Sequence, residues 1–79
     1  MFTVYILQSE KDNKRYIGFT ENLERRLNEH NSGKVKSTKH RKPLQLIYTE
    51  QFEYKTAALN REKFFKTHSG RDFLNSIGK

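Results

Sequence analysis

The sequence FTVYILQSEKDNKRYIGF, residues 2–19, carries the clearest structural signal of this chain. It contains two apolar runs with one tyrosine each, Val4-Tyr5-Ile6 and Tyr16-Ile17-Gly18. β-Branched and aromatic residues favour strands, and the polar stretch between the two runs has the length of a hairpin connection. The two tyrosines are therefore expected on adjacent antiparallel strands.

The rest of the chain predicts the order ββαβαα, an α+β fold with a small three-stranded antiparallel sheet flanked by helices. The helix after the hairpin is expected to be capped by Thr20 and to end near Gly33 at positive φ, and the last helix to open at Ser69. The expected elements are strands at 2–8, 15–19 and 44–49 and helices at about 21–30, 56–66 and from 69 onward.

The chain has 79 residues, which predicts one small domain, residues 1–79. It has no cysteine, which excludes disulfides and cysteine-bound zinc and suits a reducing cytoplasm. No apolar run approaches the ~20 residues of a membrane span, and the N-terminus lacks the basic region of a signal peptide. We therefore expect a cytoplasmic protein with no membrane partner.

The formal net charge is +7, from 16 basic and 9 acidic residues, which favours a polyanionic partner such as nucleic acid. Much of this charge falls in the stretch 34–42, which contains no acidic residue. We expect this stretch to be an open loop that contacts phosphates, with help from the Thr38 hydroxyl. The alternative is a mobile, solvated loop. The expected contacts are Lys34, Lys36, Thr38, Lys39, Arg41 and Lys42.

The first helix places charged groups on its apolar face. Leu23 and Leu27 define the buried stripe, and helical periodicity places Arg26 and His30 on the same stripe. A buried guanidinium needs an internal carboxylate or a bound anion as partner. The alternative is that the stem of Arg26 packs at the edge of the stripe with its head in water.

The second helix shows the same anomaly. Glu62 shares its expected inner face with Ala58 and Leu59, so its carboxylate must be paired, protonated or bound to a metal. The simplest alternative is an internal ion pair, with Arg26 as a candidate partner. Both helices thus direct a charged group toward the sheet that carries the tyrosines.

Tyr16 and Gly18 alternate along their strand and therefore share one face of the sheet. A glycine in a strand allows another backbone or a substrate to approach closely, so Gly18 is expected to contact substrate. Each tyrosine taken alone could equally be an ordinary core aromatic.

Taken together, these segments resemble the GIY-YIG endonuclease superfamily. The two tripeptides are similar to its signature and lie about ten residues apart, and the helix NLERRLNEH at 22–30 is similar to its helix motif. Glu62 within ALNREK at 58–63 is similar to its later glutamate. The resemblance covers nearly the whole chain and is greatest to small stand-alone bacterial members related to the nuclease subunit of the Slx structure-specific endonuclease.

The resemblance implies a role for each of five residues. Tyr5 and Tyr16 would border the scissile phosphate, one of them acting as general base or orienting the attacking water. Arg26 would hold the phosphate, His30 would assist proton transfer or substrate binding, and Glu62 would bind one divalent metal, Mg²⁺ or Mn²⁺. Because the tyrosine pKa is near ~10, a tyrosine base requires a group that lowers this pKa.

The implied activity is metal-dependent hydrolysis of DNA phosphodiesters, including branched or damaged DNA of the kind met in repair. Val4 stands where the signature has glycine, and Asn75 is the one nearby candidate for a late asparagine of the family. Two other functions remain open: a DNA-binding module with little activity unless joined by a partner subunit, and an interaction protein whose charge is incidental. The choice between DNA and RNA, the substrate structure and the oligomeric state stay open at this stage.

Overall fold

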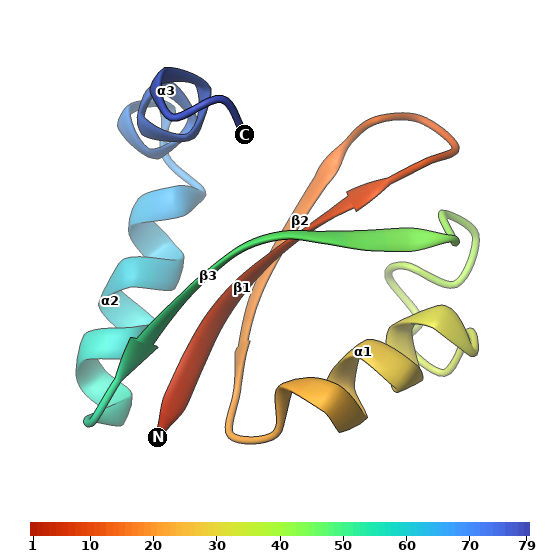
Figure 1. Ribbon diagram of the computed structural model, residues 1–79, viewed down its shortest axis with the longest axis horizontal. Helices are drawn as coiled ribbons and strands as arrows, with labels where there is room; N and C mark the ends of the chain where they lie inside the picture. The colour runs from red at the N-terminus through yellow and green to blue at the C-terminus, as the bar shows by residue number, and fades with distance from the viewer.

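The fold is an α+β arrangement in the order ββαβαα, as predicted, and the computed structural model describes all residues, 1–79 (Figure 1). The hairpin pairs two strands, and the third strand follows a long connection after the first helix. The elements are β1 (Phe2–Ser9), β2 (Arg15–Thr20), α1 (Leu23–Asn31), β3 (Leu44–Phe52), α2 (Lys55–Phe65) and α3 (His68–Ser76).

The sheet has the order β2-β1-β3 with both pairs antiparallel, so β1 is central and β2 has a free edge. In the hairpin register, Tyr5 lies opposite Gly18. The pairing of β1 with β3 shifts register between Ile6 and Leu7, which is the mark of a β-bulge. The hairpin register thus places Tyr5 of β1 directly beside the second signature segment.

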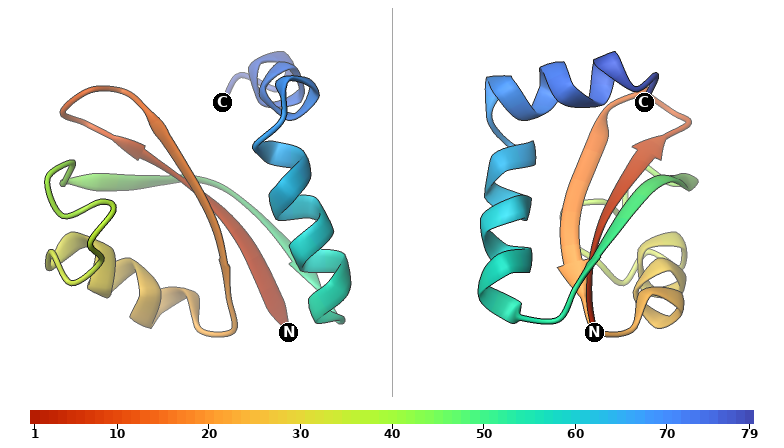
Figure 2. Two further views of the ribbon diagram at one scale, coloured as in Figure 1. Left: turned by 180° about the vertical axis from the view of Figure 1, so that it is seen from behind. Right: turned by 60° about the vertical axis from the view of Figure 1, so that its left-hand side comes forward.

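Alternation along β1 divides the core into two layers on opposite faces of the sheet. Val4 and Ile6 pack with residues of α2 and α3. Tyr5 and Leu7 form the other cluster, against which Leu23 and Leu27 of α1 and Tyr16 of β2 pack. Figure 2 shows the consequence: α1 and the following loop cover one side of the sheet, while α2 and α3 cover the other.

The helix boundaries differ slightly from the prediction. α1 begins at Leu23 because the Asn22 side chain, and not Thr20, accepts a hydrogen bond from the amide of Arg25. α3 begins at His68 because Thr67, and not Ser69, accepts from the amide of Gly70. In each case the true cap lies two residues from the expected one, and both caps have side chains that compete well for this position. The expected positive φ at Gly33 is confirmed. None of the helices is long and apolar enough to cross a membrane.

Candidate active site

The site is built around the hydroxyl of Tyr5, which lies inside the layer between the sheet and α1. Tyr5 is only 1% exposed. Its hydroxyl lies 3.0 Å from Nε2 of His30, and Nε of Arg26 donates to it at 3.4 Å. Three of the residues named by the resemblance therefore meet at one oxygen atom, which is more than ordinary core packing would require.

His30 closes the other end of this hydrogen-bond chain. It is fully buried, and its Nδ1 lies 2.8 Å from Oγ1 of Thr38. Burial, followed by the nearby positive charge of Arg26, lowers the pKa of His30 below its ordinary value of 6.5, while Glu29 opposes the shift. His30 is therefore neutral at pH 7. If its Nδ1–H donates to Thr38, Nε2 is free to accept the proton of Tyr5.

The Tyr5 phenol is held protonated in the resting protein. Burial raises its pKa above the ordinary value of 10.0, and the hydrogen bond and charge of Arg26 offset this rise only in part. A tyrosine base requires a group that lowers this pKa, and Arg26 alone does not overcome the effect of burial. His30 does not lower this pKa either, because accepting from the phenol stabilises its protonated form, but it lies where it can take the phenolic proton as another proton reaches the Tyr5 oxygen.

Arg26 finds an internal carboxylate, one of the two partners expected for it. Its Nη1 donates to Oε1 of Glu29 at 3.1 Å, one turn along α1, and its hydrogen bond to Tyr5 raises the pKa of the guanidinium. About a third of its side chain remains exposed. Because a guanidinium has five donors, Arg26 can hold these partners and still present N–H groups to a phosphate. The neighbouring Arg25 points to solvent, 73% exposed.

Tyr16 and Gly18 lie on the same face as Tyr5. The Tyr16 ring stacks edge-on against His30, with centroids 4.9 Å apart, and lies 6.5 Å from the Tyr5 ring. At Gly18 a Cβ atom would come within 2.5 Å of the Tyr5 hydroxyl. The close approach expected at Gly18 is thus made by the phenol of Tyr5 in this structure, and contact with substrate there stays a prediction.

Glu62 lies on α2, which packs on the opposite face of the sheet from the helix that carries Arg26. Its ion-pair partner is Lys66 at 3.5 Å, and not Arg26. The carboxylate is 17% exposed and still contributes to raising the pKa of Tyr5, so its charge acts at the site.

The site offers a hard divalent ion one protein ligand, the carboxylate of Glu62. No group of three or more His, Cys, Asp or Glu side chains gathers anywhere in the chain. Mg²⁺ commonly binds through one or two carboxylates, with waters and substrate phosphate oxygens as further ligands. Glu62 fits that mode, and its partly exposed carboxylate is open to such a ligand.

The basic loop at 34–42 is ordered by three contacts, which corrects the expectation of an open, self-repelling segment. Thr38 is fully buried against His30, the Ser9 hydroxyl donates to the carbonyl of Arg41, and Nζ of Lys11 donates to the carbonyl of His40 at 3.3 Å. The expected phosphate contact of the Thr38 hydroxyl does not fit this burial. The four lysines of the loop are exposed and Arg41 is half-buried, so their contact with phosphates stays a prediction: Lys34, Lys36, Lys39, Arg41 and Lys42.

Two further residues complete the site and were missed from the sequence. Glu29 neutralises part of the charge of Arg26. Its position three residues after Arg26 on the same helix could have predicted this ion pair. Asn31 bonds both the N–H and the carbonyl of Leu44, which fastens the end of α1 to the start of β3. No local pattern indicated this pairing, because Asn31 acts on a residue beyond the whole basic loop.

Asn75, the candidate late asparagine, accepts a hydrogen bond from Arg15 at 2.7 Å and connects α3 to β2.

Comparison with known proteins identifies relatives of this chain. Residues 1–75 match the family model of the GIY-YIG catalytic domain. A UPF0213 protein of Staphylococcus haemolyticus is 45% identical over 75 residues, covering 94% of this chain and 90% of the relative. A UPF0213 protein of Natronomonas pharaonis is 45% identical over 67 residues, covering 84% and 78%.

A solved structure shows the same fold. The solution NMR structure of a UPF0213 protein from Bacillus halodurans superposes with a TM-score of 0.60 at 34% identity, covering 99% of this chain and 86% of that one. The matched family model spans both tyrosine segments, α1 and Glu62. The chain belongs to the GIY-YIG family, among its UPF0213 members.

Proposed function

We propose that this protein is a metal-dependent endonuclease that hydrolyses DNA phosphodiester bonds. The observation that carries the proposal is the buried Tyr5 hydroxyl, bonded to a neutral His30 on one side and to Arg26 on the other. A core tyrosine needs one hydrogen-bond partner, whereas this arrangement supplies both a proton acceptor and a cation. Membership of a nuclease superfamily supports the same conclusion.

In the proposed reaction, Tyr5 relays a proton from the attacking water to His30. Water attacks phosphorus and gives a proton to the Tyr5 oxygen, while the Tyr5 proton passes to Nε2 of His30. The new P–O bond forms as the bond to the leaving oxygen breaks, and the leaving oxygen takes a proton from solvent. Arg26 stabilises the charge that develops on the phosphoryl oxygens and on the Tyr5 oxygen. Tyr16, on the same face, would orient the water or the phosphate.

Glu62 would hold the divalent ion, Mg²⁺ or Mn²⁺, which when bound supplies Lewis-acid stabilisation of the phosphoryl oxygens. Lys66 would have to release Glu62, and a pair of 3.5 Å with a lysine that is 57% exposed is weak enough to allow this.

The test is cleavage of labelled plasmid, flap and junction DNA with Mg²⁺ or Mn²⁺. Tyr5→Phe, His30→Gln and Arg26→Ala are expected to lower the rate by about 10²–10⁴-fold each, the range for loss of a proton-transfer or charge-stabilising group. Arg25→Ala, one residue away and solvated, should cleave like the parent chain. Cleavage that survives all three site changes would point to a contaminating nuclease and refute the assignment.

A DNA-binding module with little activity of its own is the second candidate. It is favoured by the position of Glu62, paired with Lys66 in the layer opposite Arg26. Salt-sensitive DNA binding without turnover on any of the substrates would favour this candidate. Turnover that appears with a cell extract, and is lost in the Arg26→Ala variant with the same extract, would indicate a partner subunit. In either case we place the protein in the cytoplasm, with branched or damaged DNA as the proposed substrate.

A further inference from the structure

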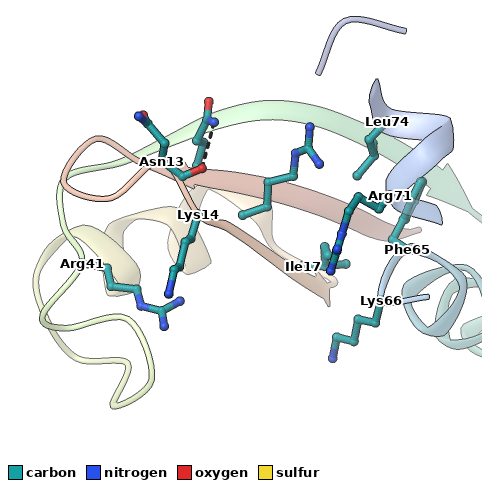
Figure 3. A pocket seen from close by; sticks show the side chains of 10 residues that line it. Asn13, Lys14, Ile17, Arg41, Phe65, Lys66, Arg71 and Leu74 are labelled. Atoms are coloured by element: carbon teal, nitrogen blue, oxygen red, sulfur yellow. Dashed lines mark hydrogen bonds between the residues drawn. The ribbon is translucent and has the colours of Figure 1, made fainter. Parts of the chain in front are cut away.

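A second basic surface lies on the face of the sheet away from Tyr5. It is a cavity of about 620 Å³ between the β1–β2 hairpin, the basic loop and the helices α2 and α3 (Figure 3). Five of its ten lining residues are cations and none is acidic. We call it the basic groove and define it by these cations, Lys14, Arg15, Arg41, Lys66 and Arg71.

The cations of the basic groove are only partly neutralised. Arg41 lies 3.8 Å from Asp12, and Lys66 pairs with Glu62. Arg15 donates to the Asn75 side chain and to the backbone oxygen of Lys79, and forms no ion pair with an acidic side chain. Lys14 and Arg71 form no ion pair, and both are exposed. Figure 3 shows Lys14 and Arg41 approaching the cavity from one side and Lys66 and Arg71 from the other. Such convergence of like charge is costly unless an anion fills the space.

The basic groove is linked to the active site by two segments of the chain. Lys66 pairs with Glu62, the proposed metal ligand. The basic loop contributes Arg41 to the groove and, three residues earlier, Thr38 to His30. Both surfaces flank β2, because Tyr16 lies on one face of this strand and Ile17 in the groove on the other. A ligand of the active site that passes around the free edge of β2 would therefore enter the groove.

The lining favours a phosphate backbone over bases. Phe65 and Leu74 are 2% and 1% exposed, so the apolar floor presents no open aromatic face on which a base could stack. What remains accessible is a set of ammonium and guanidinium groups, which bind phosphates without reading sequence.

We infer that the basic groove binds the backbone of the substrate strand next to the scissile phosphate, after that strand has turned around the edge of β2. This inference rests on the proposed function for the position of the scissile phosphate. A continuous duplex is too stiff to turn over so short a distance, since its persistence length is about 50 nm. A strand beside a gap can turn, so the groove selects interrupted DNA.

The test measures DNA binding in EDTA by fluorescence anisotropy, at a series of NaCl concentrations. The probes are a gapped duplex and a continuous duplex of the same sequence. For the gapped duplex, Lys14→Gln/Arg71→Gln is expected to reduce the slope of log Kobs against log salt by about 1.5, the loss of two phosphate contacts. Lys55→Gln/Lys63→Gln removes the same charge from exposed positions outside the groove and should change the slope by less than half as much.

Equal slopes for the groove and control variants on gapped DNA would overturn the inference. So would an equal loss on gapped and continuous DNA, because the continuous duplex should not reach the groove. Binding in EDTA requires no turnover, so a separate cleavage assay with Mg²⁺ decides the proposed function independently. Unfolding midpoints of both double variants, expected to match the parent chain, confirm that folding is unchanged.

Discussion

Tyr5 and His30 form the contact on which the chemistry depends, because each is buried and each is bonded to the other. A neutral imidazole at Nε2 can take the phenolic proton, whereas a protonated one cannot. Burial lowers the pKa of His30, which keeps the acceptor available through neutral pH. The same pair explains why a tyrosine with a raised pKa can act as a base.

The cleavage rate is expected to fall as pH drops through the pKa of His30, which lies below 6.5. Stability should fall in the same window. Since folding lowers this pKa, the unfolded chain binds more protons there, and the contribution of neutral His30 is complete above about pH 6.5 and lost below. Rate and urea-unfolding profiles measured over the same pH range check this prediction.

Substitutions of Thr38 test whether its hydroxyl positions His30. Thr38→Ser keeps a hydroxyl at Nδ1 and should retain the profile. Thr38→Val removes it, and is expected to lower the rate and cost about 1–3 kcal/mol of stability because Nδ1–H is left buried without a partner. A Val variant with the rate and stability of the parent chain would show that the 2.8 Å contact does not position His30.

Gly18→Ala is expected to abolish most cleavage and to destabilise the fold by about 1–3 kcal/mol, because the new Cβ would collide with the Tyr5 hydroxyl at 2.5 Å. In the double variant with Tyr5→Leu the added methyl has room, so the stability loss from Gly18→Ala should shrink. Urea unfolding of the four chains gives the coupling free energy. Additive losses would contradict the contact.

At the level of elements, α1 carries Arg26 and His30, while α3 carries no proposed catalytic group. Both helices are held at their start by one side-chain cap, Asn22 for α1 and Thr67 for α3. Removing either cap should weaken one helix end by a similar amount. Comparing variants that lack one cap or the other therefore distinguishes an effect on stability from an effect on activity.

Asn22→Ala and Thr67→Ala are each expected to cost about 1 kcal/mol of unfolding free energy. Only Asn22→Ala should also lower the cleavage rate, because it loosens the helix that holds Arg26 against Tyr5. Denaturant unfolding and cleavage measured on both variants check this. Equal losses of activity would mean that global stability, and not the position of α1, limits the rate.

The contact between α2 and β3 depends on Arg61. Its guanidinium bonds Glu50 through two nitrogens, at 2.7 and 3.1 Å, and lies 4.6 to 5.0 Å from the centroids of three phenylalanine rings. Burial opposes ionisation of Glu50, but hydrogen bonds from Arg61 and Tyr48 outweigh it and lower the pKa of the carboxyl. The ion pair therefore joins sheet and helix in a partly dry environment.

Arg61→Ala is expected to destabilise the protein by about 2–3 kcal/mol, through the lost charged hydrogen bonds and ring contacts. Arg25→Ala, whose pair with Glu29 is long and exposed, should cost at most ~0.5 kcal/mol. The part due to Glu50 is present above its unfolded pKa, about 4.5, and is lost as pH falls through its lower folded value. Urea unfolding at neutral and acid pH tests both statements.

For the molecule as a whole, the net charge of +7 is spread over both faces, in the basic loop and in the basic groove. Like charges at this density repel one another in the folded state. An anionic ligand relieves that repulsion, and so does salt.

The unfolding free energy is expected to rise with NaCl from low ionic strength, because screening reduces this repulsion. A Lys34→Gln/Lys36→Gln variant has less repulsion to screen and should show a shallower rise. Urea unfolding at several NaCl concentrations measures both. A fall in stability with salt would show that attractive pairs such as Arg61–Glu50 outweigh the repulsion.

The amino-acid sequence by itself determined the strands, the order of elements and the faces of α1, because alternation and helical periodicity are local properties read over a few residues. Only the tertiary structure decided which groups meet. The contact of Tyr5 with His30 spans 25 positions, Thr38 turned inward from a basic loop, and Glu62 lies in the other layer. These outcomes depend on how the sheet twists and where the helices pack, and so does the basic groove, whose cations come from four separate segments.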